Sequence, residues 1–128
     1  MTGLRLYDVL WVGAGGFLGA IGRYLVAVWV DTRYGSDFPF ATLLINVSGS
    51  FVLGIIGGAF EVESLPAEIR LGVAVGFIGA FTTFSTFTFE TVHLVEGGNA
   101  ALAFAYVAAS LLIGFAAAAL GHGIGRMV

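Results

Sequence analysis

Charge is the scarcest feature of this sequence of 128 residues. Only 10% of the residues are charged, lysine is absent, and five arginines face eight acidic residues, which gives a net charge of −3. A soluble domain of this size exposes much of its surface and needs charge to cover it. The composition therefore excludes a water-soluble monomer, and the acidic balance argues against a nucleic-acid-binding surface.

Cysteine is also absent, which excludes a disulfide framework, a thiolate metal site and a cysteine nucleophile. His93 and His122 lack the ligand spacing of a metal site. Paired carboxylates occur only at Glu61 and Glu63 in a predicted loop, and no serine, histidine and acid are grouped for catalysis. We therefore expect no enzyme activity.

Apolar residues make up 59% of the chain, and its mean hydropathy is +1.01. A bilayer core about 30 Å thick is crossed by roughly 20 helical residues. The apolar runs predict four spans, at about residues 7–30, 40–60, 68–95 and 100–124, with Ser64 as a possible N-cap before the third. We predict an all-α integral membrane protein that forms a single four-helix domain over residues 1–128.

The arginines specify the orientation in the membrane only weakly. With four spans, Arg5, Arg70 and Arg126 share one side. Arg33 lies on the other side, joined by Arg23 if its long side chain reaches outward. This bias fits a protein with its cationic side in the cytoplasm, but it also fits insertion in both orientations, which would allow an antiparallel dimer.

Glycine is unusually common, at 20 residues. In lipid, glycines four residues apart let two helix backbones approach closely. We interpret four such pairs as packing residues: Gly15 and Gly19, Gly54 and Gly58, Gly72 and Gly76, and Gly121 and Gly125. So small a bundle leaves little room for a pore, and we expect any aqueous pathway at a subunit interface of a homo-oligomer.

The third span holds the run Gly-Phe-Ile-Gly-Ala-Phe-Thr-Thr-Phe-Ser-Thr-Phe-Thr-Phe-Glu at 76–90. Glycine and β-branched threonine both weaken a helix, and threonine hydroxyls compete for backbone carbonyls. We predict a break between Gly79 and Thr83. Carbonyl groups freed by such a break suit a small hard cation such as sodium.

Beyond the predicted break, Phe84 and Phe87 share a helical face. By themselves they fit ordinary core or lipid-facing aromatics. Ser85 and Thr86, however, put hydroxyl donors beside the positive edges of the rings. Several weak contacts of this kind suit an anion that must leave as well as enter.

Polar residues also interrupt the other spans. Asn46 either contacts a ligand or makes an interhelical hydrogen bond, because an unpaired amide in hydrocarbon is costly. Tyr106 and Ser110, four residues apart, put two hydroxyls on one face of the last span. Arg23 is a cation well inside the first predicted span, and it is either functional or extends to the head groups.

The sequence resembles the Fluc (also called CrcB) family of fluoride channels along nearly its whole length. The likeness lies in Gly-Arg-Tyr at 22–24, Ala-Thr-Leu-Leu-Ile-Asn-Val-Ser-Gly at 41–49 and, most specifically, the run at 76–90. The resemblance implies an antiparallel, dual-topology homodimer with two fluoride pores and one central sodium ion.

The resemblance also implies roles for individual residues. Backbone carbonyls of Gly79 and Thr82 from each subunit would hold a structural sodium ion, and Arg23 would stand in a vestibule. The fluoride pathway would be formed by Asn46, Phe84, Phe87, Ser85, Thr86, Tyr106 and Ser110. One departure is Gly114, a turn beyond Ser110, where the hydroxyl track of the family can continue.

The implied function is passive export of fluoride across the cell membrane, down its electrochemical gradient, with fluoride resistance as the outcome. The alternative is a small multidrug-resistance-type transporter, a four-helix protein coupled to protons. Such a carrier needs a membrane-embedded carboxylate, and the first span has only Asp8 at its edge, while Glu90 lies toward the end of the third. A third hypothesis is an assembly subunit without transport of its own.

Overall fold

The computed structural model describes residues 3, 5–62 and 65–128. Glu63 and the possible N-cap at Ser64 lie outside the described residues. Within the described part, four helices are long and apolar enough to cross a membrane, namely Leu6–Tyr34, Phe40–Glu61, Ala67–Glu96 and Ala100–Gly125. The prediction of an all-helical chain with four membrane-capable helices is confirmed.

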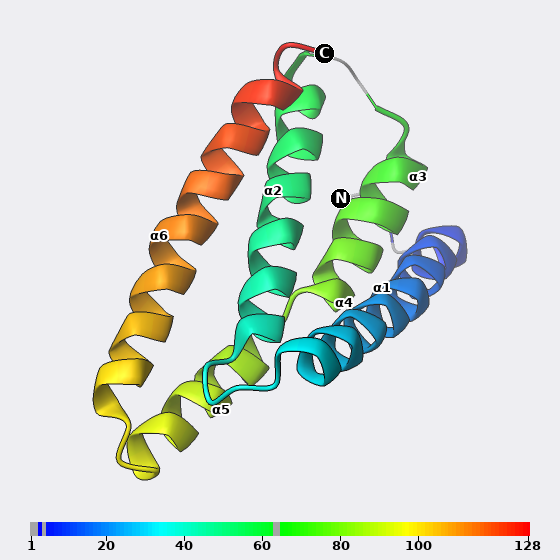
Figure 1. Ribbon diagram of the computed structural model, residues 1–128. Helices are drawn as coiled ribbons and strands as arrows, with labels where there is room; N and C mark the ends of the chain where they lie inside the picture. The colour runs from blue at the N-terminus through cyan, green and yellow to red at the C-terminus, as the bar shows by residue number, and fades with distance from the viewer. Residues whose placement is uncertain (1–2, 4, 63–64) are drawn as a thin grey trace.

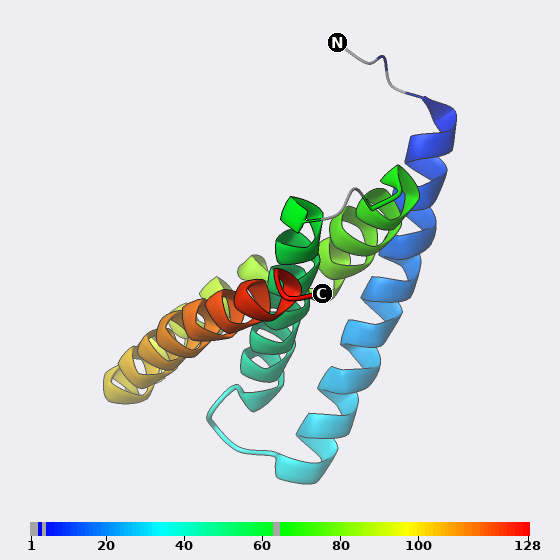
Figure 2. The same cartoon turned by 90° about the horizontal axis from the view of Figure 1, so that it is seen from above.

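Two helix pairs build the molecule. α2 (Phe40–Val62) and α6 (Ala100–Gly125) run side by side and make the most extensive contact (Figure 1). α1 (Leu6–Tyr34) packs along the first half of the third span, and Figure 2 shows this second pair beside the first. The third span consists of α3 (Ala67–Ile69), the π-helix η1 (Arg70–Ile78), α4 (Gly79–Phe81) and α5 (Phe84–Glu96).

All four predicted glycine pairs lie where these helices touch. A Cβ atom on Gly15 would collide with the Gly72 carbonyl oxygen of η1, and one on Gly121 would collide with the Phe51 carbonyl oxygen of α2. Every glycine of the four pairs leaves less than ordinary van der Waals space for a Cβ atom. The close backbone approach expected from the spacing is therefore confirmed.

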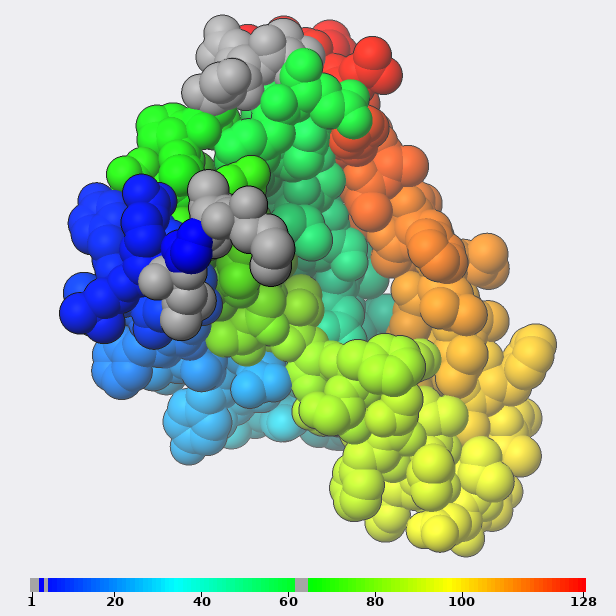
Figure 3. Space-filling model, turned by 180° about the vertical axis from the view of Figure 1, so that it is seen from behind, coloured from blue at the N-terminus to red at the C-terminus, as the bar shows by residue number. Residues whose placement is uncertain are grey.

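The third span is interrupted within the predicted range. α4 ends at Phe81, and Thr82 and Thr83 have extended backbones with ψ of 157° and 111° before α5 begins. The chain changes direction at this point (Figure 1). As a result, α5 and the start of α6 stand out from the rest of the molecule, as the yellow-green and yellow lobe in Figure 3 shows.

Candidate functional site

The break in the third span is held by one side chain of α2. Asn46 Oδ1 accepts a hydrogen bond from the Thr83 backbone N–H at 2.8 Å, and Asn46 Nδ2 donates to the Thr83 carbonyl at 3.1 Å. Thr83 is only 6% exposed, so without these bonds two backbone groups would be buried without partners. The interhelical hydrogen bond considered for Asn46 is therefore present.

At the same break, two backbone carbonyl groups lose the N–H groups that would bond to them in a continuous helix. In a continuous α-helix the Thr83 N–H would bond to the Gly79 carbonyl, and the Thr86 N–H would bond to the Thr82 carbonyl. Here the Thr83 N–H bonds to Asn46, and the Thr86 N–H bonds to the Thr83 hydroxyl at 3.2 Å. Gly79 and Thr82 are the residues predicted to hold sodium through their carbonyls. Free carbonyl oxygens are ligands that a hard cation prefers, so these two residues fit that ion.

A groove of about 280 Å³, here called the phenylalanine groove, opens beside the break. It is lined by Asn46, Gly49, Ser50, Leu53, Ile78, Thr82, Thr83, Phe84, Phe87, Ser110 and Leu111. The ring centroids of Phe84 and Phe87 lie 5.9 Å apart, and Phe84 is 77% exposed. The Ser110 hydroxyl is buried and has no hydrogen-bond partner among the residues that the structure describes.

A second groove, of about 260 Å³, lies on the other side of Thr83 and is here called the arginine groove. Its lining residues are Ala20, Arg23, Tyr24, Ala27, Thr42, Ile45, Thr83 and Thr86. The predicted site residues are thus divided. Asn46, Phe84, Phe87 and Ser110 meet in the phenylalanine groove, whereas Arg23 and Thr86 meet in the arginine groove.

Two hydroxyl groups predicted for the pathway, those of Ser85 and Tyr106, form hydrogen bonds with other residues of the chain. The exposed Ser85 hydroxyl lies 3.2 Å from Thr83 Oγ1. The Tyr106 side chain is fully buried, with its ring edge-to-face with Phe87 at 5.2 Å. Its hydroxyl donates to Glu90 Oε2 at 2.7 Å.

Glu90, which the sequence analysis considered only as a carboxylate for the alternative transporter, has a structural role that was not predicted. Its other oxygen, Oε1, accepts a hydrogen bond from the Thr42 hydroxyl at 2.9 Å, so its carboxylate links α5 to both α2 and α6. The available signal was an ionisable residue at the end of a hydroxyl-rich run inside an apolar span, which is a functional hypothesis by default.

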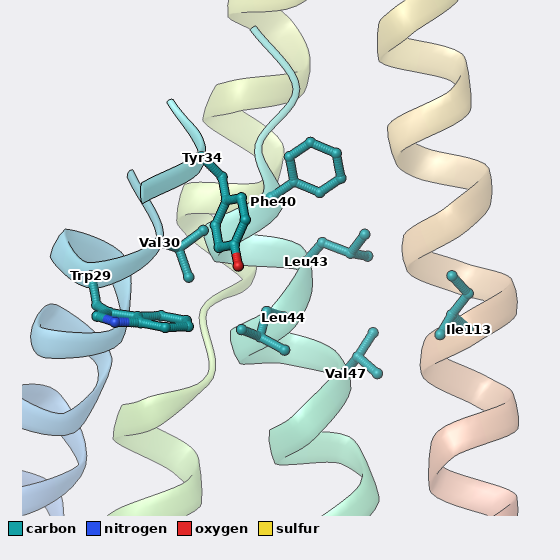
Figure 4. Close-up of a pocket in the computed structure, with 8 residues that line it drawn as sticks. All are labelled: Trp29, Val30, Tyr34, Phe40, Leu43, Leu44, Val47 and Ile113. Atoms are coloured by element: carbon teal, nitrogen blue, oxygen red, sulfur yellow. The ribbon is translucent and has the colours of Figure 1, made fainter. Parts of the chain in front are cut away.

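A larger groove, of about 580 Å³, lies away from the break and has an apolar lining. Figure 4 shows its residues: Trp29, Val30, Tyr34, Phe40, Leu43, Leu44, Val47 and Ile113. None of the predicted site residues lines it. Gly114, which follows Ile113 on α6, has open space where a side chain would stand.

Comparison with known proteins gives one consistent family. The family described as CrcB-like protein, Camphor Resistance (CrcB), matches residues 10–122. Relatives named Fluoride-specific ion channel FluC include one from Acidobacterium capsulatum, which is 42% identical over 93% of this chain and 96% of its own. Others come from Anaeromyxobacter dehalogenans, at 48% over 86% and 88%, and Nitrobacter winogradskyi, at 43% over 94% and 96%. The family match covers the break and both grooves.

Proposed function

Because the chain belongs to the CrcB family of fluoride ion channels, we propose that it conducts fluoride passively out of the cell, down the electrochemical gradient of the ion. The family consists of channels and not of enzymes. With four membrane-capable helices, the chain is a multi-pass membrane protein. Its proposed location is the cell membrane, surrounded by lipid.

The observation that carries this proposal is the chemistry of the phenylalanine groove. Fluoride is small and strongly hydrated, so its water must be replaced by hydrogen-bond donors at close range. Asn46 and Ser110 supply an amide and an unpartnered hydroxyl, while Phe84 and Phe87 supply rings with positive edges. No cation is among the lining residues. These weak donors would bind the ion loosely enough to release it.

We propose that two chains complete this pathway as an antiparallel, dual-topology homodimer. Phe84 is largely exposed, and Gly79 has open space where a Cβ atom would stand. An exposed aromatic ring beside a half-open polar groove supports a second chain as its cover. Each of the two pores would then be lined by rings from both subunits. Such a pore would be narrow, and chloride, the larger ion, would be excluded.

A structural sodium ion between the two chains belongs to the same proposal. The carbonyl oxygens of Gly79 and Thr82, whose helical partners are diverted, would hold it from each subunit. When bound, the ion would supply positive charge that satisfies these carbonyls inside the membrane. The residues of this chain prepare the site by keeping the break open through Asn46.

The remaining predicted residues take positions along the proposed path. Arg23 would attract the anion into the arginine groove, where the Thr86 hydroxyl also lies. Ser85 and Tyr106 would join the path only by exchanging their hydrogen bonds to Thr83 and Glu90.

Fluoride release from liposomes that contain only this protein, with the proton gradient collapsed, tests the proposal. A passive channel releases fluoride under these conditions. Release that requires a proton gradient would instead favour the multidrug-type transporter. Of the two carboxylates available to such a carrier, Asp8 pairs with Arg5 at 2.9 Å and Glu90 is bonded inside the bundle. No release, together with one co-purifying larger partner, would favour an assembly subunit.

A further inference from the structure

We propose that Thr83 is a positioning residue that determines which polar groups present hydrogen atoms to the anion in the two grooves. This inference rests on the proposed function. Thr83 lines both grooves, is 6% exposed, and is hydrogen-bonded to Asn46, Ser85 and Thr86. It can therefore set the hydrogen-bond polarity on both sides without contacting fluoride itself.

The backbone of Thr83 fixes the orientation of the Asn46 amide. An asparagine side chain has one acceptor oxygen and one NH2 group, and a free side chain could turn either toward a ligand. Thr83 N–H needs an acceptor and the Thr83 carbonyl needs a donor, and the two bonds at 2.8 Å and 3.1 Å satisfy both at once. A flipped amide would lose both bonds. One Asn46 Nδ2 hydrogen therefore stays available on a residue that lines the phenylalanine groove.

The hydroxyl of Thr83 determines which groups donate and which accept hydrogen bonds beside the arginine groove. Thr83 Oγ1 donates to Thr86 Oγ1 at 3.0 Å and accepts from the Thr86 N–H at 3.2 Å. A hydroxyl has only one hydrogen, so in the 3.2 Å contact with Thr83 the donor must be Ser85. Thr86 Oγ1 already accepts a bond, and its own hydrogen remains available in the arginine groove.

This arrangement keeps an Asn46 hydrogen free in the phenylalanine groove and the Thr86 hydroxyl hydrogen free in the arginine groove, and it uses the Ser85 hydrogen within the protein. An anion is attracted by hydrogen atoms and repelled by oxygen lone pairs, so the assignment matters for conduction. Without the Thr83 hydroxyl, the Thr86 hydroxyl is free to donate back to the carbonyl four residues earlier, as threonines in helices do. The arginine groove would then lose the Thr86 hydroxyl as a donor and keep Arg23.

The test compares Thr83→Val with Thr83→Ser in liposomes that contain the full chain, with fluoride release as the readout. Valine keeps the shape and removes the hydroxyl, and flux should fall on the order of tenfold, as expected for losing one hydrogen bond to an ion. The fluoride concentration for half-maximal flux should rise, whereas a merely structural loss would lower only the maximal rate. Serine should restore both. Thr91→Val is the matched control, because the Thr91 hydroxyl donates a hydrogen bond to the Phe87 carbonyl of its own helix and Thr91 lines neither groove.

A double substitution tests the route through Thr86. If Thr83 acts by directing the Thr86 hydrogen, Thr83→Val combined with Thr86→Val should conduct as well as Thr86→Val alone. Additive losses would overturn the inference, as would wild-type flux in Thr83→Val. Should Thr83→Val fail to fold, Thr86→Val alone decides, since unchanged flux there would also overturn the inference. If the wild-type protein releases no fluoride, the proposed function fails. If the wild-type protein releases fluoride but the variants do not behave as predicted, only the inference about Thr83 fails.

Discussion

At the scale of single residues, the site depends on side chains that replace helical hydrogen bonds. Asn46 takes the place of the Gly79 carbonyl as the acceptor for the Thr83 N–H, and Thr83 in turn caps the start of α5. These substitutions keep the break free of unpaired backbone groups and leave carbonyls and donors for ions. The residues that form the pathway are thus also the residues that hold its shape.

Replacing Phe84 or Phe87 by isoleucine should reduce fluoride flux by about tenfold or more, because a branched alkyl group lacks the positive ring edge. The measurement is fluoride release from liposomes with an ion-selective electrode. Phe89→Ile is the control on the same helix, since the Phe89 ring stacks on His93 and lines neither groove. Unchanged flux in both Phe84→Ile and Phe87→Ile would remove these rings from the pore.

Tyr106→Phe should lower the free energy of unfolding by about 1.5–3 kcal/mol, as expected for a hydrogen bond to a charged group. The buried Tyr106 hydroxyl donates to Glu90, so its removal leaves a carboxylate oxygen without this partner. Thermal unfolding in detergent measures the change, and Tyr24→Phe provides a control on an exposed tyrosine. Wild-type stability with reduced flux would mean that the hydroxyl serves the pathway alone.

At the scale of helices, the sequence predicted what depends on local composition. The apolar runs predicted the four helices, and the glycine spacing predicted close approach of helix backbones. The clustered glycine and threonine predicted the break. The sequence did not predict the π-helical geometry of η1, because a hydrophobic run does not distinguish i→i+5 from i→i+4 hydrogen bonding. Nor could it pair Asn46 with Thr83 or Glu90 with Tyr106, because such contacts depend on how separate helices pack.

Two neighbouring glycines of α6 should respond to alanine in opposite directions. Gly121→Ala should destabilise the protein by about 1–3 kcal/mol or more, because the added Cβ meets the backbone of α2. Gly123→Ala should stabilise it by up to about 1 kcal/mol, because open space surrounds Gly123 and alanine favours the helix. Thermal unfolding of the two variants side by side measures both. Equal effects would contradict the packing of α2 against α6.

At the scale of the whole molecule, one chain displays only half of the proposed site. The phenylalanine groove is open, and the carbonyls of Gly79 and Thr82 have lost their helical partners. Four residues that the sequence analysis grouped in one pathway, Asn46, Phe84, Phe87 and Ser110, line the phenylalanine groove, whereas Thr86 of the same group lines the arginine groove. The sequence placed them together only as a set of rings and polar groups within the apolar spans. It could not divide them between two grooves, since that division depends on the position of Thr83 between α1, α2 and α6.

Removal of sodium should abolish fluoride flux, and adding sodium back should restore it, because the ion would satisfy the diverted carbonyls in the assembled protein. The measurement is fluoride release in buffers in which a large organic cation replaces sodium, with potassium chloride addition as the control for ionic strength. Full activity after exhaustive sodium removal would contradict a structural role for the ion.

The central claim is that a broken helix lined with rings and hydroxyls conducts fluoride and excludes chloride. Fluoride and chloride release from the same liposome preparation, with only this protein in the membrane, tests that claim most directly. We predict rapid fluoride release and chloride release no faster than from empty liposomes. Equal release of the two ions, or release of neither, would contradict the account.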